Sequence, residues 1–401
     1  MRTGFREASN NRRRRPRLVT RPFLLVMLST LAYFISVGAL IPTLPRYVKG
    51  PLQHGDAAVG LTIGSFALAA VVLRPMVGRL GDVRGRRLLI VAGGTLVGVS
   101  VLAYIPANAL GPLLLLRLLS GAGEAFFYVG AASVINDLAP DERRGEALSY
   151  FSLALFAGIA VGPAIGEFVL GATNFDVVWL VAAVTGFFAG ALGFKVPETR
   201  PEDAGQQVRR RIVHPAALEP GMILAASIWG LATFTAFVPL YTIEIGMSGS
   251  RLVFVVHAVT IMLIRSFGAR IPDVLGPGRS ARLALTVVAA GLIVMGTWAE
   301  PAGLFVGTFV FALGQAFAFP ALMTLALRGA PAAERGSVVG TFTAFFDLAF
   351  GVGAVSAGAI AEVLGYRGSF LSAAGIAIAG LALLMWRKIR AARLREAEAA
   401  A

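Results

Sequence analysis

Long apolar blocks alternate with short polar connections along this chain of 401 residues. Residues 23–45, 88–106 and 367–386 are clear examples, each close to the ~20 residues that a helix needs to cross a bilayer. The first block is too long for a signal-peptide core, so we expect it to be retained. The pattern predicts an all-α membrane protein with twelve transmembrane helices. The expected helices are residues 22–45, 57–77, 88–106, 111–138, 146–170, 176–195, 219–243, 252–271, 282–299, 302–327, 337–363 and 367–387.

The longest polar stretch divides the chain into two halves. Residues 196–218 follow the sixth expected helix and carry acidic residues and an arginine run, so they predict a cytoplasmic linker. The linker separates an N-terminal six-helix bundle, residues 22–195, from a C-terminal six-helix bundle, residues 219–387. A basic cytoplasmic tail, residues 1–21, and a second cytoplasmic tail, residues 388–401, complete the organisation.

The two halves repeat at an offset of 191 residues without gaps over two blocks. In the first block, the residues Arg74, Arg79, Asp82, Val83 and Gly85 correspond to Arg265, Arg270, Asp273, Val274 and Gly276. In the second, the residues Gly123, Ala125, Phe126, Pro140, Arg144 and Gly145 correspond to Gly314, Ala316, Phe317, Pro331, Arg335 and Gly336. Six helices per repeat is an even number, so both halves keep one orientation. This predicts two pseudo-symmetric bundles about an axis along the membrane normal.

Charge sets the expected topology. The formal net charge is +14, which in a soluble protein would suggest nucleic acid, but here the charges lie between the apolar blocks. With the N-terminus inside, 29 Lys and Arg residues fall on the cytoplasmic side and four fall in outer loops. This asymmetry predicts a multi-pass protein of the inner (plasma) membrane with both termini cytoplasmic. The basic tail is suited to anionic membrane lipid, and no nucleic-acid partner is expected.

Signatures of enzymes are missing from the sequence. The chain has no cysteine, which excludes thiolate nucleophiles and cysteine metal sites, and its three histidines are scattered. It also lacks a phosphate-binding Gly-Lys-Ser/Thr loop, so ATP-driven pumping is unsupported. We therefore expect no enzymatic activity, no metal and no cofactor. The driving force would come from an ion gradient, a proton gradient above all, or from the substrate itself.

A glycine- and arginine-rich segment, Gly78 to Arg87, follows the second expected helix. Glycines permit a tight turn there, and Asp82 can accept hydrogen bonds from a neighbouring helix N-terminus. The segment resembles the signature loop of the Major Facilitator Superfamily, and the likeness extends over roughly residues 22–390. The resemblance implies a gating network in which the loop arginine pairs with an acid at the end of the fourth helix. The matching residues are Gly78, Gly81, Asp82, Gly85, Arg86 and Asp137.

The second copy of this segment is degraded, because Pro272 replaces Gly81 and Pro277 stands where Arg86 would be. A gating role for the second copy is therefore not expected.

The fourth expected helix carries two charges at bilayer depth. Arg117 and Glu124 are seven residues apart, about 10 Å along the axis and on one face of the helix. A charge at the bilayer centre costs about 2.5–3.5 kcal/mol on insertion scales, so such residues face partners or a cavity. The stretch resembles the family's fourth-helix motif, whose arginine is linked to proton transfer, although Ser120 replaces the usual glutamine. A purely structural pair is the alternative.

Further polar residues lie within the expected helices. Asp347 is about 15 Å deep, and either Arg74 or Arg265, which are repeat partners, could neutralise it. Gln315 is the repeat partner of Glu124, and His257 could titrate near neutrality or link helices by hydrogen bonds. The candidate residues for proton coupling in a central cavity are Glu124, Arg117, Asp347, Gln315, Arg74 and Arg265.

The fifth expected helix contains Gly158, Gly162 and Gly166, with Pro163 beside the second glycine. Three glycines at four-residue spacing make a flat face for close packing of another helix. The pattern also resembles one that is typical of antiporters in the superfamily, which favours export. Generic small-residue packing is the alternative, and Glu167 departs from the pattern where a second glycine is more common.

The resemblance implies that two bundles rock about a central cavity lined by the first, fourth, seventh and tenth helices. Candidate cavity residues are Tyr33, Phe126, Trp229, Phe234, Phe317, Phe319 and His257, although any one of these aromatics could simply pack helices. The favoured function is proton-coupled export of a small amphipathic drug or metabolite by a monomer. Alternatives are an uptake symporter, a sugar or metabolite exporter, or a sensor or scaffold that does not transport.

Overall fold

The computed structural model describes residues 18–140, 143–171, 174–199, 213–267, 274–328, 330 and 334–400, and all of the long elements in them are α-helices. The N-terminal half contains α1 (Arg21–Lys49), α2 (Asp56–Arg84), α3 (Arg86–Leu102), α4 (Leu110–Leu138), α5 (Arg144–Leu170) and α6 (Phe175–Phe194). The C-terminal half contains α7 (Pro215–Glu244), α8 (Arg251–Phe267), α10 (Pro277–Thr297), α11 (Pro301–Arg328) and α12 (Arg335–Ala400).

Glycine and proline set several helix boundaries. α2 ends at Gly85, whose φ of 101° is easily reached only without a Cβ, and α3 begins directly afterwards. α7 and α10 begin with a proline in the first turn, where the missing N–H costs no intrahelical bond. α12 contains one non-helical residue, Gly365 with φ of 69°, which divides it into two helical parts. The expected boundary between residues 363 and 367 falls at this glycine.

Several expected boundaries require correction. α2 continues to Arg84 rather than ending at residue 77, so Gly78, Gly81 and Asp82 are helical and only Gly85 makes the turn. α7 begins at Pro215 rather than at residue 219. Much of the expected linker, residues 200–212, lies outside the described part, as do Pro272 and Asp273. Nine helices in the described residues are long and apolar enough to cross a membrane. That number treats α12 as one helix and omits α3 and α8, which have 17 residues each.

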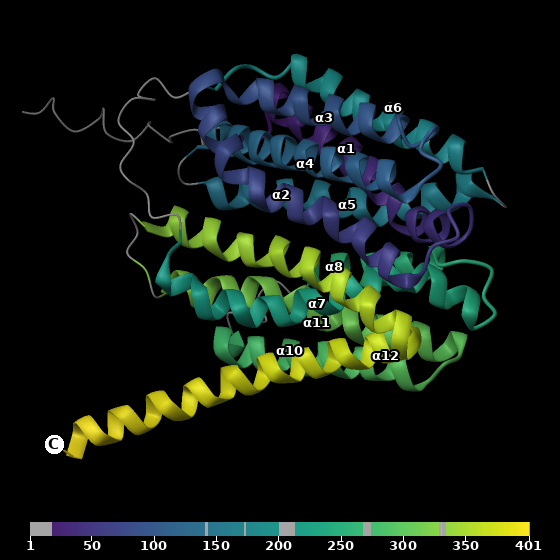
Figure 1. Ribbon diagram of the computed structural model, residues 1–401. Helices are drawn as coiled ribbons and strands as arrows, with labels where there is room; N and C mark the ends of the chain where they lie inside the picture. Colours follow the sequence, from purple (N-terminus) through teal and green to yellow (C-terminus); the bar gives the residue numbers. More distant parts are fainter. Residues whose placement is uncertain are drawn as a thin grey trace, which may run out of the picture.

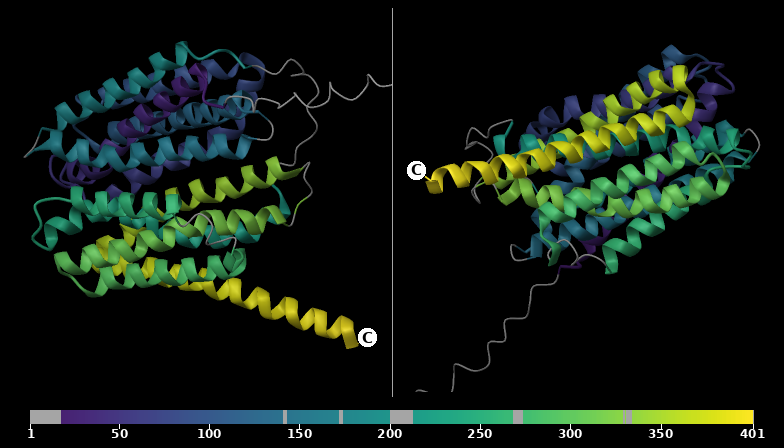
Figure 2. Two further views of the ribbon diagram at one scale, coloured as in Figure 1. Left: turned by 180° about the vertical axis from the view of Figure 1, so that it is seen from behind. Right: turned by 90° about the horizontal axis from the view of Figure 1, so that it is seen from below.

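The helices form two groups that lie side by side (Figure 1). In the N-terminal group, α1 packs against α5 and α6, and α4 packs against α2 and α3. In the C-terminal group, α7 packs against α12, and α10 packs against α11. The last part of α12 projects beyond both groups in all three views (Figures 1 and 2). We call the end of the molecule where α1 leads into α2 the Lys49 end, and the end where α2 leads into α3 the Arg86 end.

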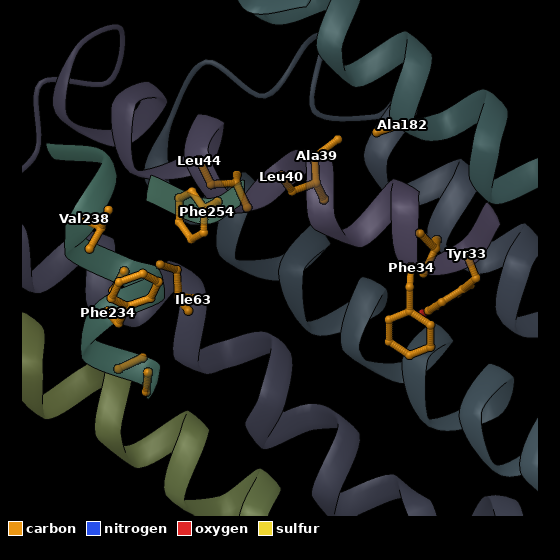
Figure 3. Packing of buried hydrophobic residues seen from close by; sticks show 14 of the residues in the cluster. Tyr33, Phe34, Ala39, Leu40, Leu44, Ile63, Ala182, Phe234, Val238 and Phe254 are labelled. Atoms are coloured by element: carbon orange, nitrogen blue, oxygen red, sulfur yellow. The ribbon is translucent and has the colours of Figure 1, made fainter. Parts of the chain in front are cut away.

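The main contacts between the groups are those of α2 with α12, α5 with α8 and α1 with α7. Small residues permit the first contact, since a Cβ on Gly64 would lie 2.6 Å from the Gly351 carbonyl oxygen. Towards the Lys49 end, side chains of both groups share one apolar core. Figure 3 shows Leu44 and Ile63 of the first group near Phe234 and Phe254 of the second. The two groups therefore meet in a packed apolar contact at that end.

Candidate functional site

Arg74 of α2 holds two carboxylates from different parts of the fold. Its Nη2 lies 3.1 Å from both oxygens of Glu124 on α4, and its Nη1 donates to Asp347 on α12. The pair with Asp347 crosses the boundary between the helix groups, whereas the pair with Glu124 stays within the first group. The sequence left open which arginine neutralises Asp347, and the geometry assigns Arg74. If both carboxylates are ionised, the single guanidinium leaves one excess negative charge at this place.

The surroundings of this triad are largely closed to solvent. The side chains of Arg74, Glu124 and Asp347 are 18%, 8% and 13% exposed. The ring of Tyr128 lies 4.6 Å from the Arg74 guanidinium carbon, and Arg74 Nε is buried without a hydrogen-bond partner. From the helix rise, Glu124 is about 21 Å from either end of α4, which places it at the middle of that helix. Tyr128 was not expected from the sequence, although it stands one helical turn after Glu124.

Arg117 does not pair with Glu124, so the alternative of a structural pair between them is not seen. Arg117 Nε donates to the Thr62 carbonyl at 2.9 Å, and its guanidinium lies over the ring of Phe66 at 4.5 Å. Spacing by seven residues puts both charges on one face of α4, but they contact different residues of α2: Arg117 binds at Thr62 and Glu124 binds Arg74. Ser120, between them, bonds to Ser100 at 2.7 Å and to Tyr104 at 2.9 Å.

The repeat partners in the C-terminal half make different contacts. Arg265 on α8 lies over the ring of Phe156 on α5 at 4.0 Å, and its Nε is buried without a hydrogen-bond partner. No ion pair involves Arg265 in the part of the chain that the structure describes. Gln315 on α11 donates its amide to the Ser227 carbonyl at 2.9 Å. The two halves therefore have equivalent helices, but an ion pair at Arg74 and Glu124 has no counterpart at Arg265 and Gln315.

His257 stacks on Phe234 and Phe311, with ring centroids 4.8 and 5.8 Å apart. Its Nε2 is buried without a hydrogen-bond partner, so this nitrogen does not link helices. Tyr33 stacks on Phe127 at 3.9 Å, and its hydroxyl is also buried and unpaired.

The aromatic residues expected to line the cavity divide into fully buried and half-buried side chains. Tyr33 and Phe234 are fully buried within the core. Partly exposed side chains are those of Phe126, Trp229, Phe317 and Phe319. Phe126 packs beside a small cluster that contains Val77 and Leu89, and Phe319 makes an edge contact with Phe342 at 5.4 Å. A lining role for these rings stays a prediction.

The expected gating residues come together at the Arg86 end. Arg86 pairs with Asp137 at the end of α4 and, at 3.6 Å, with Asp82 one turn earlier on α2. Glu198, which was not expected at this site, accepts the backbone N–H of Arg86 at 2.7 Å and thereby caps α3. A Cβ on Gly81 would lie 2.7 Å from Leu89 Cδ1, so this glycine permits close packing of α3.

Two acids join the helix groups at the Lys49 end. Glu167 at the end of α5 accepts the backbone N–H and hydroxyl of Ser250 at 2.8 and 2.5 Å, the N–H of Arg251, and a bond from Arg46 at 2.8 Å. These donors surround the first turn of α8, where unpaired N–H groups and the helix dipole favour an anion.

The second acid is Glu362 on α12, which accepts the Ala57 N–H at 3.1 Å in the first turn of α2. Beside it, Tyr366 donates to Asp56 at 3.1 Å. Among the described hydrogen bonds and ion pairs, those between the groups lie either here or at Arg74, and none lies at the Arg86 end.

The glycine face of α5 packs on α1, as the sequence predicts. A Cβ on Gly158 would lie 2.6 Å from Phe34 Cβ, and one on Gly162 would lie 2.6 Å from Gly38 Cα. Gly166 faces Ala39 in the same row, and Pro163 lies beside Gly38. This confirms close small-residue packing and leaves the antiporter reading a prediction. In the described ranges, no three His, Cys, Asp or Glu side chains gather as a metal site would require.

Comparison with known proteins shows which family the chain resembles. It is 28% identical over 361 residues to an uncharacterised MFS-type transporter of Salmonella typhimurium, covering 88% of this chain and 92% of the relative. A bacterial homologue of the human lysosomal transporter Spinster, in an inward-facing unoccupied conformation, superposes with a TM-score of 0.76 at 13% identity, covering 90% and 95%. The nucleoside transporter NupG gives 0.68 at 14% identity, covering 91% and 98%. The family model of the Major Facilitator Superfamily matches residues 26–331 and 251–400, so this chain belongs to that superfamily of membrane transporters.

Proposed function

We propose that the protein is a proton-coupled secondary transporter that exports a small amphipathic compound. One observation carries the proposal: Arg74 bridges Glu124 of one helix group and Asp347 of the other. The superfamily supports transport of a small molecule, and the triad supplies a reason for coupling to protons. The proposed architecture is twelve transmembrane helices in two bundles, with the two parts of α12 on either side of Gly365 counted separately.

The coupling step follows from the charges. Burial disfavours ionised carboxylates, and a neighbouring guanidinium favours them, so one arginine cannot fully satisfy two acids. Uptake of one proton by the triad removes the excess negative charge. If Asp347 takes the proton, the ionic contact between the helix groups weakens and they are freer to move apart. Proton binding and the change of conformation are then one event.

The two ends supply the proposed gates. At the Lys49 end, Glu167 and Glu362 each bind the first turn of a helix in the other group. We propose that this is the outer end and that the conformation described here is closed to the outside. At the Arg86 end, Asp82, Arg86 and Asp137 form a network within the first group, suited to lock the alternate conformation. The packed glycine face of α5 supports the antiporter reading.

The experiment uses the full chain in proteoliposomes that enclose a pH-sensitive dye. A library of amphipathic drugs, sugars and metabolites is added outside, and coupled transport changes the internal pH. An antiporter and a symporter move protons in opposite directions relative to the compound, so the sign of the pH change separates export from uptake. Counterflow of a labelled hit separates both from a sensor or scaffold, which would show none.

The proposed orientation has its own test, because the native chain contains no cysteine. Ala8→Cys and Glu398→Cys should both resist an impermeant thiol reagent added to intact cells, since both tails are expected to be cytoplasmic. Rapid labelling of either would reverse the proposed topology. The same samples, after permeabilisation, provide the positive control.

A further inference from the structure

Arg265 occupies in the C-terminal half the place that Arg74 occupies in the N-terminal half. The offset of 191 residues that relates these arginines also relates Glu124 to Gln315 and Asp347 to Phe156. The correspondence holds in space as well: Arg74 crosses between the groups from α2 to Asp347 on α12, and Arg265 crosses from α8 to Phe156 on α5. Both partners of Arg74 are acids, and both equivalents in the second half are uncharged.

The consequence is an arginine that has no counter-ion among the described residues. The Arg265 guanidinium carbon lies 4.0 Å from the centre of the Phe156 ring, and Nε is buried with no hydrogen-bond partner. Gln315 carries no charge that could neutralise Arg265, and the hydrogen bond described for its side chain is donated by the amide nitrogen to the Ser227 carbonyl. No acidic side chain within the described ranges pairs with Arg265.

A ring beneath a guanidinium offsets only part of the cost of holding the charge inside a membrane protein. Such a cation is normally paired, and an arginine presents a fork of N–H donors that matches a carboxylate or sulfonate. The described residues supply no such partner for Arg265, which leaves the guanidinium available to a ligand. Beside it on α8 and α11, Ile261, Ile264, Ala312 and Ala316 form an apolar cluster that suits the body of an amphipathic molecule.

We propose that Arg265 binds the anionic oxygen group of the substrate, which makes the transported compound an amphipathic organic anion. This inference rests on the proposed function, since it names the substrate class of that transporter. It gives the two equivalent contacts complementary roles. The contact at Arg74 has an excess of negative charge and takes the proton, and the contact at Arg265 has an excess of positive charge and takes the anion.

The test measures binding without any gradient. Three probes share one apolar scaffold: cyclohexanepropionate, the matching alcohol and the matching amine. Thermal unfolding of the detergent-solubilised full chain is followed by helical circular dichroism at increasing probe concentration, because a ligand that binds the folded state raises the melting temperature. Cyclohexanepropionate should stabilise the protein more than the alcohol does, and the amine should have the least effect.

Variants of Arg265 and Phe156 test whether stabilisation by the carboxylate depends on this contact. Arg265→Gln should weaken the apparent affinity for cyclohexanepropionate at least about tenfold, and Arg265→Lys should keep part of it. Phe156→Asp recreates the acid found at the equivalent position, Asp347, so it should pair with Arg265 and abolish the preference for the anion. Phe156→Leu removes the ring without adding charge and should retain that preference.

Equal stabilisation by the three probes, stabilisation by the amine alone, or no stabilisation by the carboxylate would overturn the proposal. Unchanged anion binding in folded Phe156→Asp would also overturn it. These failures differ from failure of the proposed function, which shows as transport without proton movement. Anion binding that depends on Arg265 but is not accompanied by coupled proton movement would sustain this inference and reject proton coupling.

Discussion

Arg74 of α2 forms an ion pair with Asp347 of α12, and the same guanidinium lies 3.1 Å from both oxygens of Glu124 on α4. The relationship ties the two helix groups together through one side chain. Because Arg74 also has a buried Nε without a partner, its hydrogen-bonding capacity is not exhausted by the two acids. A change in protonation at either acid therefore changes how Arg74 holds the other.

Removing either acid should separate proton coupling from transport. Glu124→Gln leaves Arg74 and Asp347 as a balanced pair, so the excess negative charge that recruits a proton disappears. We expect this variant to bind substrate and to keep downhill exchange, but to lose transport driven by a pH gradient. Asp347→Asn should also lose pH-driven transport. The assay compares uphill and exchange rates in proteoliposomes, once the library screen has supplied a substrate.

Glu146→Gln is the matched control, because Glu146 pairs with Arg143 at the surface and the change should leave both rates intact. Full uphill transport in Glu124→Gln together with its loss in Asp347→Asn would assign the proton site to α12 alone. Full uphill transport in both variants would exclude proton coupling through this triad.

Glu167 should keep the Lys49 end closed. Glu167→Gln removes the charge that accepts bonds from Ser250, Arg251 and Arg46. A hydrogen bond to a charged group contributes about 1.5–3 kcal/mol, so the closed conformation should lose roughly tenfold or more in relative population. Leu44→Cys, at a buried position near this end, then reports opening through faster reaction with an impermeant thiol reagent.

Glu300→Gln provides the comparison for this prediction. Glu300 lies at the same end, but it accepts a bond from Trp298 within its own helix group at 3.1 Å. It should therefore leave the labelling rate unchanged. Equal acceleration by Glu300→Gln, or none by Glu167→Gln, would refute a closing role for Glu167.

The sequence predicted the helices and the Arg86-end network well, because both depend on local spacing. The gating residues Asp82, Arg86 and Asp137 do meet. Apolar block length defined most helix ends to within a few residues, with the end of α2 as the main exception. The sequence did not show which charged residues on different helices pair with each other. Arg74 and Arg265 are equivalent by spacing, and only the three-dimensional packing of α2 against α12 selects Arg74 for Asp347.

Helical spacing also left the partner of Arg117 undetermined. A separation of seven residues fixes which face of α4 two side chains share, but it does not say which neighbouring helix each one reaches. Arg117 reaches the Thr62 carbonyl, whereas Glu124 reaches Arg74, further along the same helix. Glu362 gave no local signal, since it acts on the N-terminus of a helix some 300 residues earlier in the chain.

The close contact of α5 with α1 should be sensitive to one methyl group. In Gly162→Ala the new Cβ would lie 2.6 Å from Gly38 Cα, a backbone atom that cannot rotate away. We expect the free energy of unfolding to fall by about 1–3 kcal/mol, the usual cost of overpacking. Gly375→Ala in α12 has open space at its Cβ position and should be neutral or stabilising, because alanine favours helix. Thermal unfolding of the two purified variants gives the comparison, and equal melting temperatures would contradict the packing argument.

Asp82 should affect the rate of conformational change and not the affinity for substrate. Its side chain is 41% exposed and lies 3.6 Å from Arg86, so the pair contributes at most about 1 kcal/mol to folding. Asp82→Asn should therefore fold normally, bind substrate normally on each locked state, and transport more slowly, because one partner of the network at the Arg86 end is gone. Asp137→Asn removes the closer partner of Arg86 and should slow transport further and lower the melting temperature as well. Binding and transport rates are measured on the same preparations. A loss of affinity in Asp82→Asn that matches its loss of rate would place Asp82 in the binding pathway and reject a role confined to gating.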